Sequence, residues 1–310
     1  MAKRTTNNTT RSAKALRHAL IVVIATICIV TAVIVGVVRL SARWLAGLSS
    51  STVTQDTSSY CMAKQTDGVM SYALSAEQSA NAALITAIGV TRGLPDHAAT
   101  VALATAMQES KLRNLEYGDR DSLGLFQQRP SQGWGTVEQL MDENYATNAF
   151  YDGLVKVSGW ESLPVEDAAQ EVQHSGYPDA YAQWDGLARA WAQSLTGEVA
   201  AGVGCKLPDA DASDPDGLIA ALQSAYPSVS GSRADGNKGD SPVTAVFTMP
   251  ADLSGDNLRR AVWQTSTWLV VNARHYGITK IEANGMVWTR ADTAWTGTEK
   301  EGDVVTVTFA

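Results

Sequence analysis

The chain has 310 residues, of which 45% are hydrophobic and 18% are charged. This length and composition suit about two globular domains and exclude a disordered or collagen-like chain. The net charge of −8 is unevenly distributed, because every acidic residue lies after Trp44. From Trp44 onward, 17 basic residues stand against 32 acidic ones, a charge of −15 that argues against a nucleic-acid partner.

Residues 19–38 carry no charge and are long enough for a helix to cross the apolar core of a membrane. The stretch is longer than the core of a signal peptide, and Arg39 and Arg43 follow it where small residues would mark a cleavage site. We therefore expect one uncleaved transmembrane helix, with a cleaved signal peptide or a buried core helix as the alternatives. The basic tail, residues 1–18, predicts a cytoplasmic N-terminus and an extracellular remainder, joined to the anchor by a Ser/Thr-rich tether at 39–60.

Three cysteines fit this topology. Cys28 lies within the expected membrane helix, where a thiol behaves as a small hydrophobic group. Cys61 and Cys205 both fall on the exported, oxidising side, and they bracket the segment that carries the chemical motifs. We predict a disulfide that ties the two ends of that segment together, with two unrelated thiols as the alternative.

A mostly helical domain is expected between these cysteines, at residues 61–205. Ser75 and Gln78 form a capping-box pattern that predicts the start of a helix. Asp96 begins a second, alanine-rich helix that ends near Glu109. Further helices are predicted at 137–157, 165–174 and 179–195.

The pattern changes after residue 205. Residues 206–216 are acidic and contain two prolines, which predicts an extended, solvated linker. Residues 217–310 indicate a small α+β domain, because β-branched and aromatic runs alternate with one stretch of helical period. The expected strands are 243–249, 278–283, 286–289 and 304–309, and the expected helix is 255–274.

The strongest chemical motif lies in the helical domain. Glu109 and Ser110 end the alanine-rich helix, and the segment 121–130 (DSLGLFQQRP) follows, then 133–135 (GWG). The apolar residues that precede Glu109 can raise the pKa of its carboxyl and keep it protonated for acid catalysis. An exposed glutamate at a helix end is the alternative interpretation.

These motifs, with 172–176 (VQHSG) and 179–181 (DAY), resemble an actinobacterial branch of the soluble lytic transglycosylase and goose-type lysozyme superfamily. The resemblance covers about residues 70–197. It implies a lysozyme-like fold and the glycan strand of peptidoglycan as substrate. Glu109, which matches the catalytic glutamate of the family, would protonate the glycosidic oxygen and then act as a base toward the muramyl C6 hydroxyl or water.

The resemblance also implies a set of substrate contacts and no cofactor. Ser110 would orient Glu109 or its sugar, Gly124 would allow the backbone to lie close to the saccharide, and Gln127 matches a substrate-contacting glutamine. Where the family has Tyr-Asn-Ala-Gly, this chain has Gln173-His174-Ser175-Gly176, so Gln173 or Ser175 would take over those contacts. The predicted substrate-binding residues are Ser110, Gly124, Gln127, Gln128, Gln173, Ser175 and Tyr181.

Two other sets of side chains have more than one interpretation. Phe126, Trp134 and Tyr181 could stack on sugar rings, but core packing is the favoured role for each. Asp119 and Asp121 could supply a second carboxylate for a hydrolytic route, but an acidic surface loop is the favoured interpretation.

The C-terminal region contains the stretches 278–288 (ITKIEANGMVW), 293–295 (TAW) and 303–309 (DVVTVTF). With these it is similar to a domain related to zinc D-alanyl-D-alanine carboxypeptidases, without the metal ligands of that family. The ligand-bearing stretch reads 238–247 (KGDSPVTAVF), and Val304 and Thr306 stand where the closing strand would need imidazoles. His275 is the single histidine of this region, and one histidine cannot build a three-ligand catalytic zinc site. We therefore expect a metal-free domain that serves binding or spacing.

Two functions follow from the sequence. The first is a membrane-anchored enzyme that cleaves peptidoglycan glycan strands, either as a lytic transglycosylase or as a muramidase-type hydrolase. The second is a non-catalytic protein of cell-wall binding or of conjugation or secretion assembly. The intact Glu109 motif favours the enzyme, while the degenerate C-terminal domain keeps the alternative open. Opening of the wall for a secretion or conjugation apparatus is compatible with both.

Overall fold

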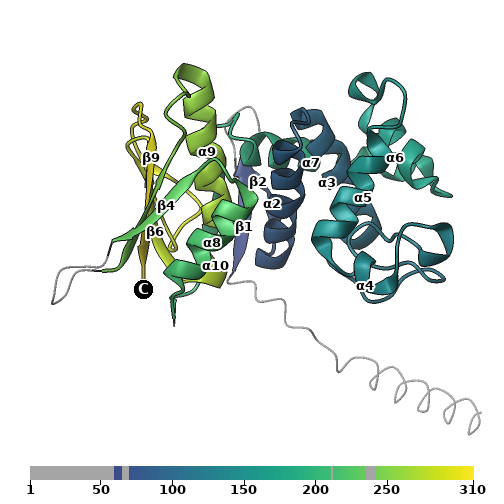
Figure 1. Cartoon of the computed structure of the whole chain (residues 1–310), viewed down its shortest axis with the longest axis horizontal. Helices are drawn as coiled ribbons and strands as arrows, with labels where there is room; N and C mark the ends of the chain where they lie inside the picture. Colours follow the sequence, from purple (N-terminus) through teal and green to yellow (C-terminus); the bar gives the residue numbers. More distant parts are fainter. Residues whose placement is uncertain (1–58, 65–69, 211, 235–241) are drawn as a thin grey trace, which may run out of the picture. The chain divides into compact units, whose positions relative to one another are not determined.

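The computed structural model describes residues 59–64, 70–210, 212–234 and 242–310 (Figure 1). The predictions for the basic tail, the transmembrane helix, Cys28 and all but the end of the tether fall outside these residues. Within the described ranges, no helix is both long and apolar enough to cross a membrane. The described chain combines helices with antiparallel sheets, which confirms an α+β architecture.

Helices make up most of the region between Cys61 and Cys205. The α-helices of the described chain are α2 (Ala76–Thr91), α3 (Asp96–Ser110), α4 (Val137–Leu140), α5 (Glu143–Leu154), α6 (Val165–Gln173), α7 (Asp185–Leu195), α8 (Pro215–Ala225), α9 (Gly255–Val271) and α10 (Ala273–Tyr276). Short 3₁₀ turns occur at η1 (Pro130–Gln132), η2 (Trp160–Ser162), η3 (Pro178–Ala180) and η4 (Ala182–Trp184). The strands are β1 (Tyr60–Lys64), β2 (Met70–Leu74), β3 (Val203–Lys206), β4 (Ser230–Ala234), β5 (Thr244–Thr248), β6 (Ile278–Ala283), β7 (Met286–Thr289), β8 (Thr296–Gly297) and β9 (Val304–Phe309).

The first two helices begin and end where the sequence predicts. The Ser75 hydroxyl accepts a hydrogen bond from the Gln78 N–H, and the Gln78 side chain accepts one from the Ser75 N–H, so the capping box is confirmed. Helix α3 is almost entirely buried, because its alanines allow neighbouring helices to approach on several sides. It ends at Lys111, which adopts the left-handed conformation with φ 57°.

A three-stranded antiparallel sheet, which the sequence analysis did not predict, closes the helical region. Its strand order is β2-β1-β3, and Cys61 lies directly opposite Cys205 across the β1–β3 pair. The two cysteines form the predicted disulfide. The bond joins residues 144 positions apart, so the start and the end of the helical region are held in one sheet.

The C-terminal region contains a six-stranded antiparallel sheet of order β4-β5-β9-β6-β7-β8. The predicted strands near β5, β6, β7 and β9 and the predicted helix that became α9 and α10 are confirmed. Helix α8 and strand β4 were not predicted. Asp214 caps α8 by accepting a hydrogen bond from the Gly217 N–H, and Pro215 occupies its first turn.

The predicted linker, 206–216, overlaps β3 at its start and α8 at its end. Most of the described side chains between those elements are exposed, but Leu207 is buried. The Leu207 N–H donates to the Arg290 carbonyl, and the Arg290 side chain donates to the Pro208 carbonyl. The first part of the linker is therefore bound to the C-terminal sheet.

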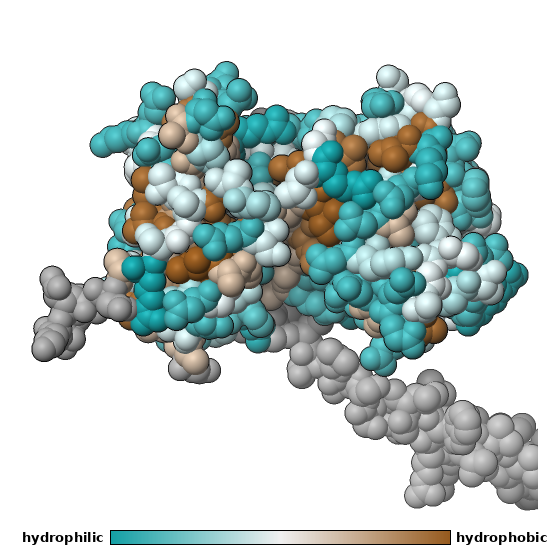
Figure 2. Space-filling model, viewed as in Figure 1, coloured by the Kyte–Doolittle hydropathy of each residue, from teal (hydrophilic) through white to brown (hydrophobic). Residues whose placement is uncertain are grey.

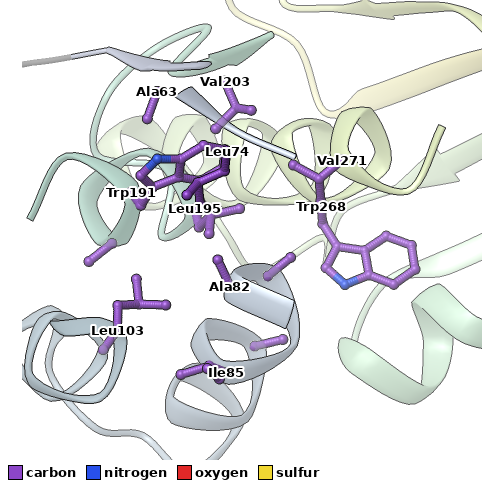
Figure 3. Packing of buried hydrophobic residues seen from close by; sticks show 14 of the residues in the cluster. Ala63, Leu74, Ala82, Ile85, Leu103, Trp191, Leu195, Val203, Trp268 and Val271 are labelled. Atoms are coloured by element: carbon purple, nitrogen blue, oxygen red, sulfur yellow. The ribbon is translucent and has the colours of Figure 1, made fainter. Parts of the chain in front are cut away.

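The helical and C-terminal regions contact each other and belong to one compact unit. Figure 3 shows side chains from α2, α3, α7 and α9 meeting beside β1 and β3. Helix α9 binds α7 and the residues after it, because the Thr267 hydroxyl donates to the Ser194 carbonyl and Arg260 pairs with Glu198. The buried contact makes the two regions parts of a shared core.

The C-terminal region also binds the edge strand β3. The indole N–H groups of Trp288 and Trp295 donate to the carbonyls of Cys205 and Val203. A side chain at Gly204 would collide with the backbone of Thr293, so glycine permits this approach. Strand β3 thus links the disulfide to both regions.

We expect one free thiol, that of Cys28, when the denatured chain is titrated without reductant, and three after reduction. The Cys61→Ala/Cys205→Ala variant should lose about 4 to 5 kcal/mol of unfolding free energy, because the disulfide closes a loop of well over a hundred residues. Denaturant unfolding with and without reductant measures this loss, and the double variant should show no further response to reductant. Three reactive thiols before reduction would contradict the disulfide.

Candidate active site

Glu109 lies on the last turn of α3, where its carboxylate can be held by residues from other helices. The Tyr181 hydroxyl donates a 2.6 Å hydrogen bond to Glu109 Oε1. Tyr181 is fully buried and comes from the turn between η3 and η4. A short bond between a buried phenol and a carboxylate fixes the orientation of the carboxylate.

Burial raises the pKa of the Glu109 carboxyl above its ordinary value. Hydrogen bonds from Tyr181 and Gln173 and the charge of Lys111 lower that pKa, but burial remains the largest effect. Because α3 ends at this point, its negative dipole end also disfavours a charged carboxylate. The site therefore favours a protonated Glu109 at pH values where an exposed glutamate is ionised.

Ser110 fastens the helix end to the loop that follows. Its hydroxyl donates to the carbonyls of Ala106 and Leu125, at 3.0 and 2.7 Å, and accepts from the Arg113 N–H. Ser110 is buried, so its placement suits positioning of the Glu109 backbone. Of the two roles that the resemblance implies for Ser110, the geometry fits orientation of Glu109.

The loop that carries Gly124, Gln127 and Gln128 packs beside this helix end. Gly124 has a φ of 76°, and a side chain there would collide with the Leu140 carbonyl, so its close approach is to the protein's own backbone. Gln128 is buried, and its side-chain amide donates to the Ala146 carbonyl. Gln127 is partly exposed and donates to the carbonyls of Tyr117 and Gly124.

Gln173 joins this loop to the end of α3. Its amide donates to the Phe126 carbonyl at 2.8 Å, and its side chain also hydrogen-bonds Glu109. Ser175 follows on the same segment, where its hydroxyl accepts from the Tyr177 N–H and interacts with Tyr181. The structure thus brings Glu109, Gln173, Ser175 and Tyr181 together around one carboxyl group.

The sequence analysis did not find a second layer of contacts beside Glu109. Gln108 Oε1 accepts hydrogen bonds from the Trp184 indole and the Gln183 amide, at 2.8 and 3.2 Å. Lys111 Nζ lies over the Trp184 ring, 4.3 Å from its centroid. Gln108 and Lys111 flank the Glu109-Ser110 motif, but only the tertiary fold shows that Trp184 meets them.

Left-handed backbone conformations gather around the site. Seven non-glycine residues of the described chain have a positive φ, and four of them belong to the segments that hold Glu109. These four are Lys111, Leu112, Gln127 and His174. Such conformations cost about 1 to 3 kcal/mol each and persist where the surrounding structure enforces them, which often happens at functional sites.

The two aspartates considered as second carboxylates have different surroundings. Asp121 accepts hydrogen bonds from Arg129 Nε and the Ser131 N–H. Both bonds lower the pKa of Asp121, and the bond from the Ser131 backbone has the larger effect. Both oxygens of Asp121 therefore hold the loop together. Asp119 is exposed and lies 3.8 Å from Arg120.

The aromatic candidates are mainly packing residues. Phe126 is fully buried and stacks on Phe150, with 4.6 Å between the ring centroids. Trp134 is partly buried against the core, and its carbonyl accepts from the Tyr145 hydroxyl. The Tyr181 hydroxyl donates a hydrogen bond to Glu109. These positions agree with core packing as the favoured role for Phe126.

In the C-terminal region, His275 is exposed on α10 and its ring lies edge-on to Tyr276. Val304 and Thr306 are on β9. Residues 238–241 of the compared stretch lie outside the described residues. Among the residues that the structure describes, no group of three or more His, Cys, Asp or Glu side chains could hold a metal ion.

Comparison with known protein families finds no family model that matches the chain, and a search of curated proteins finds no matching relative. We therefore infer the function of the chain from its motifs and from the geometry around Glu109.

We expect Glu109→Gln to raise the melting temperature at about pH 7 and to leave it unchanged near pH 4. Between these values the folded chain keeps the Glu109 proton that the unfolded chain has released, so its stability falls as pH rises through the raised pKa. The glutamine variant avoids this loss because it does not ionise. Thermal unfolding over that pH range measures the difference.

The exposed Glu116 provides the matched control. Glu116→Gln should change the melting temperature little, because substitutions of exposed residues away from packed features have small effects on stability. If Glu109→Gln has the same melting temperature as the parent at both neutral and acid pH, the raised pKa of Glu109 is contradicted.

Proposed function

We propose that this protein is a membrane-anchored enzyme that cleaves the glycan strands of peptidoglycan, with a lysozyme-like catalytic domain at residues 61–205. The observation that carries the proposal is the half-buried Glu109, whose pKa is raised and whose carboxylate is held by Tyr181 and Gln173. A glycosidic oxygen is a weak base, so its cleavage needs a carboxylic acid that stays protonated near neutral pH.

In the proposed reaction, protonated Glu109 donates its proton to the glycosidic oxygen between N-acetylmuramic acid and N-acetylglucosamine as the C1–O bond breaks. The substrate's acetamido group stabilises the positive charge that develops at C1. The Glu109 carboxylate then removes a proton from the muramyl C6 hydroxyl, which attacks C1 and forms a 1,6-anhydro ring. Water in place of that hydroxyl would give the muramidase outcome.

The surroundings of Glu109 support a mechanism with a single carboxylate. Asp121 is committed to Arg129 and the Ser131 backbone, and its lowered pKa keeps it ionised, so it carries no proton to donate to a glycosidic oxygen. Gln127, Gln173 and Ser175 are partly exposed amide and hydroxyl groups that can hydrogen-bond sugar hydroxyl and acetamido groups. The lytic transglycosylase is therefore the preferred form of the proposal.

The proposed location follows from the sequence together with the disulfide. An uncharged stretch at 19–38 would anchor the chain in the cell membrane with its N-terminus in the cytoplasm. The Cys61–Cys205 bond suits an oxidising space outside the membrane, where the peptidoglycan lies.

We expect Glu109→Gln in the full-length chain to abolish release of muropeptides from purified cell walls, because glutamine cannot donate the required proton. Mass spectrometry of the soluble products measures the release, and it separates 1,6-anhydro ends from reducing ends by the mass of one water. Glu116→Gln, an exposed change seven positions along the chain, should retain activity. Equal release by the Glu109→Gln and parent chains would refute the assignment and favour the non-catalytic wall-binding alternative.

We expect Tyr181→Phe to lower kcat and to move the alkaline limb of the pH–rate profile to higher pH. The hydroxyl of Tyr181 stabilises the ionised form of Glu109, so its removal raises the pKa of the carboxyl further and extends the protonated range upward. Rates measured across the pH range check the shift. A lower rate with an unmoved limb would show that Tyr181 acts through packing alone.

A further inference from the structure

A groove with a volume of about 750 Å³ runs between the helical region and the C-terminal region. Its floor is the outer side of α2, where Leu84 and Ile88 are partly exposed. Figure 2 shows hydrophobic surface over α2, in a hollow between elements of the two regions. We call this the α2–α8 groove, and its lining residues are Ala80, Asn81, Leu84, Ala87, Ile88, Thr91, Glu143, Asn144, Ala221, Ser224, Ala225, Trp268, Asn272, His275 and Tyr276.

The chemistry of this lining is that of a site for neutral sugars. Tyr276 supplies partly exposed aromatic surface, and the largely buried Trp268, whose indole points away from Trp191 and Leu195 in Figure 3, contributes a small part of the lining. Asn144 is exposed and brings an amide that can hydrogen-bond hydroxyl and acetamido groups, whereas the Asn81 and Asn272 amides already donate to the Leu112 and Trp268 carbonyls. Aromatic faces with a few directed polar groups are typical of pockets that bind small, partly apolar ligands.

The groove carries little net charge of its own, although the chain beyond Trp44 is strongly acidic. Glu143 is the one carboxylate of the lining, and its Oε1 accepts a 2.7 Å hydrogen bond from the Asn114 amide. Among the described residues, the lining contains no lysine or arginine. A neutral ligand therefore fits the groove better than an anion or a basic peptide.

One end of the groove connects with the segment that follows Glu109. Asn81 donates to the Leu112 carbonyl at 2.8 Å, and Glu143 binds Asn114 on the same segment. These contacts join the groove wall to the segment after Glu109 through the protein interior. The neutral lining with its amide groups favours a glycan over a charged protein segment.

We propose that the α2–α8 groove is an accessory binding site for the glycan strand, formed jointly by the helical and C-terminal regions. The choice of ligand rests on the proposed function, whereas the groove does not take part in bond cleavage. The C-terminal region thereby contributes one wall of a substrate site, with α8, α9 and α10 facing α2 and α5.

The test fills the groove from each wall in the full-length Glu109→Gln chain, which binds glycan without cleaving it. Ser224→Trp acts from α8 and Asn144→Trp acts from α5, and both positions are exposed. The probes are the hexasaccharide of N-acetylglucosamine and insoluble peptidoglycan. We expect each variant to bind the hexasaccharide about tenfold more weakly, because the bulky ring occupies the space of a sugar and its aromatic contact.

Gln223→Trp is the matched control, since Gln223 is exposed beside Ser224 on α8 and does not line the groove. It should bind as the unsubstituted chain does, and unchanged melting temperatures would show that all variants fold. In the chain with Glu109 intact, Ser224→Trp should raise KM for long strands and leave kcat unchanged.

Binding and cleavage separate this proposal from the proposed enzyme activity. Loss of binding in Ser224→Trp and Asn144→Trp supports the groove, even where the parent chain proves unable to cleave. Normal binding by both variants, an equal loss in Gln223→Trp, or no hexasaccharide binding by the parent chain overturns it. A smaller mass of Ser224→Trp in light scattering, with glycan binding unchanged, would make the groove an interface between copies and also overturn it.

Discussion

The antiparallel pairing of β1 with β3 is the contact on which both regions of the described chain depend. It brings together Cys61 and Cys205, and it gives α2 a fixed start because the Ser79 hydroxyl donates to Cys61 Sγ. The other side of this pair receives the indoles of Trp288 and Trp295 from the C-terminal sheet. Pairing two strands that lie far apart in the sequence costs conformational entropy. A covalent bond at this pair therefore stabilises both α2 and the C-terminal sheet, which pack against it.

That framework allows an unfavourable arrangement at the end of α3. A carboxyl group is buried beside the negative end of a helix dipole, and residues with left-handed backbone conformations surround it. The compensation is local: Tyr181 and Gln173 bond the carboxylate, and Ser110 fixes the helix end to the Leu125 carbonyl. These bonds lower the pKa of Glu109, but burial outweighs them and leaves that pKa above its ordinary value, a property that a general acid needs.

The sequence predicted the elements whose signals are local. The capping box at Ser75 and the alanine-rich helix to Glu109 are read from neighbouring residues, and so are the strands near the Asn284-Gly285 turn. Strands β1 and β3 are short and pair with partners far along the chain, so no local period indicates them. Helix α8 did carry a signal, Asp214 followed by Pro215, but the acidic, proline-containing context suggested a linker instead.

In the candidate site, too, local sequence signals were predictable and long-range contacts were not. Glu109 stands out by its motif, whereas Trp184 reaches Gln108 only through the tertiary fold. The buried positions of Ser110, Gly124 and Gln128 also depend on packing, because a motif records which residues occur together and not which of them face solvent. Sequence reasoning therefore located the candidate glutamate but could not assign which neighbours support it from inside the protein.

The packing of α9 against α7 connects the C-terminal region with the elements that surround the site. Helix α7 begins directly after Trp184, and its far end is bound by Thr267 and by the backbone approach of Arg260 to Gly197. Because Trp184 and Tyr181 precede α7, a helix held at its far end also restrains the turn that carries both. The two regions that the sequence separates by a linker are thus in contact through α7 and α9, and the turn that holds the Glu109 carboxyl is followed by a helix that is bound by residues more than 150 positions beyond Glu109.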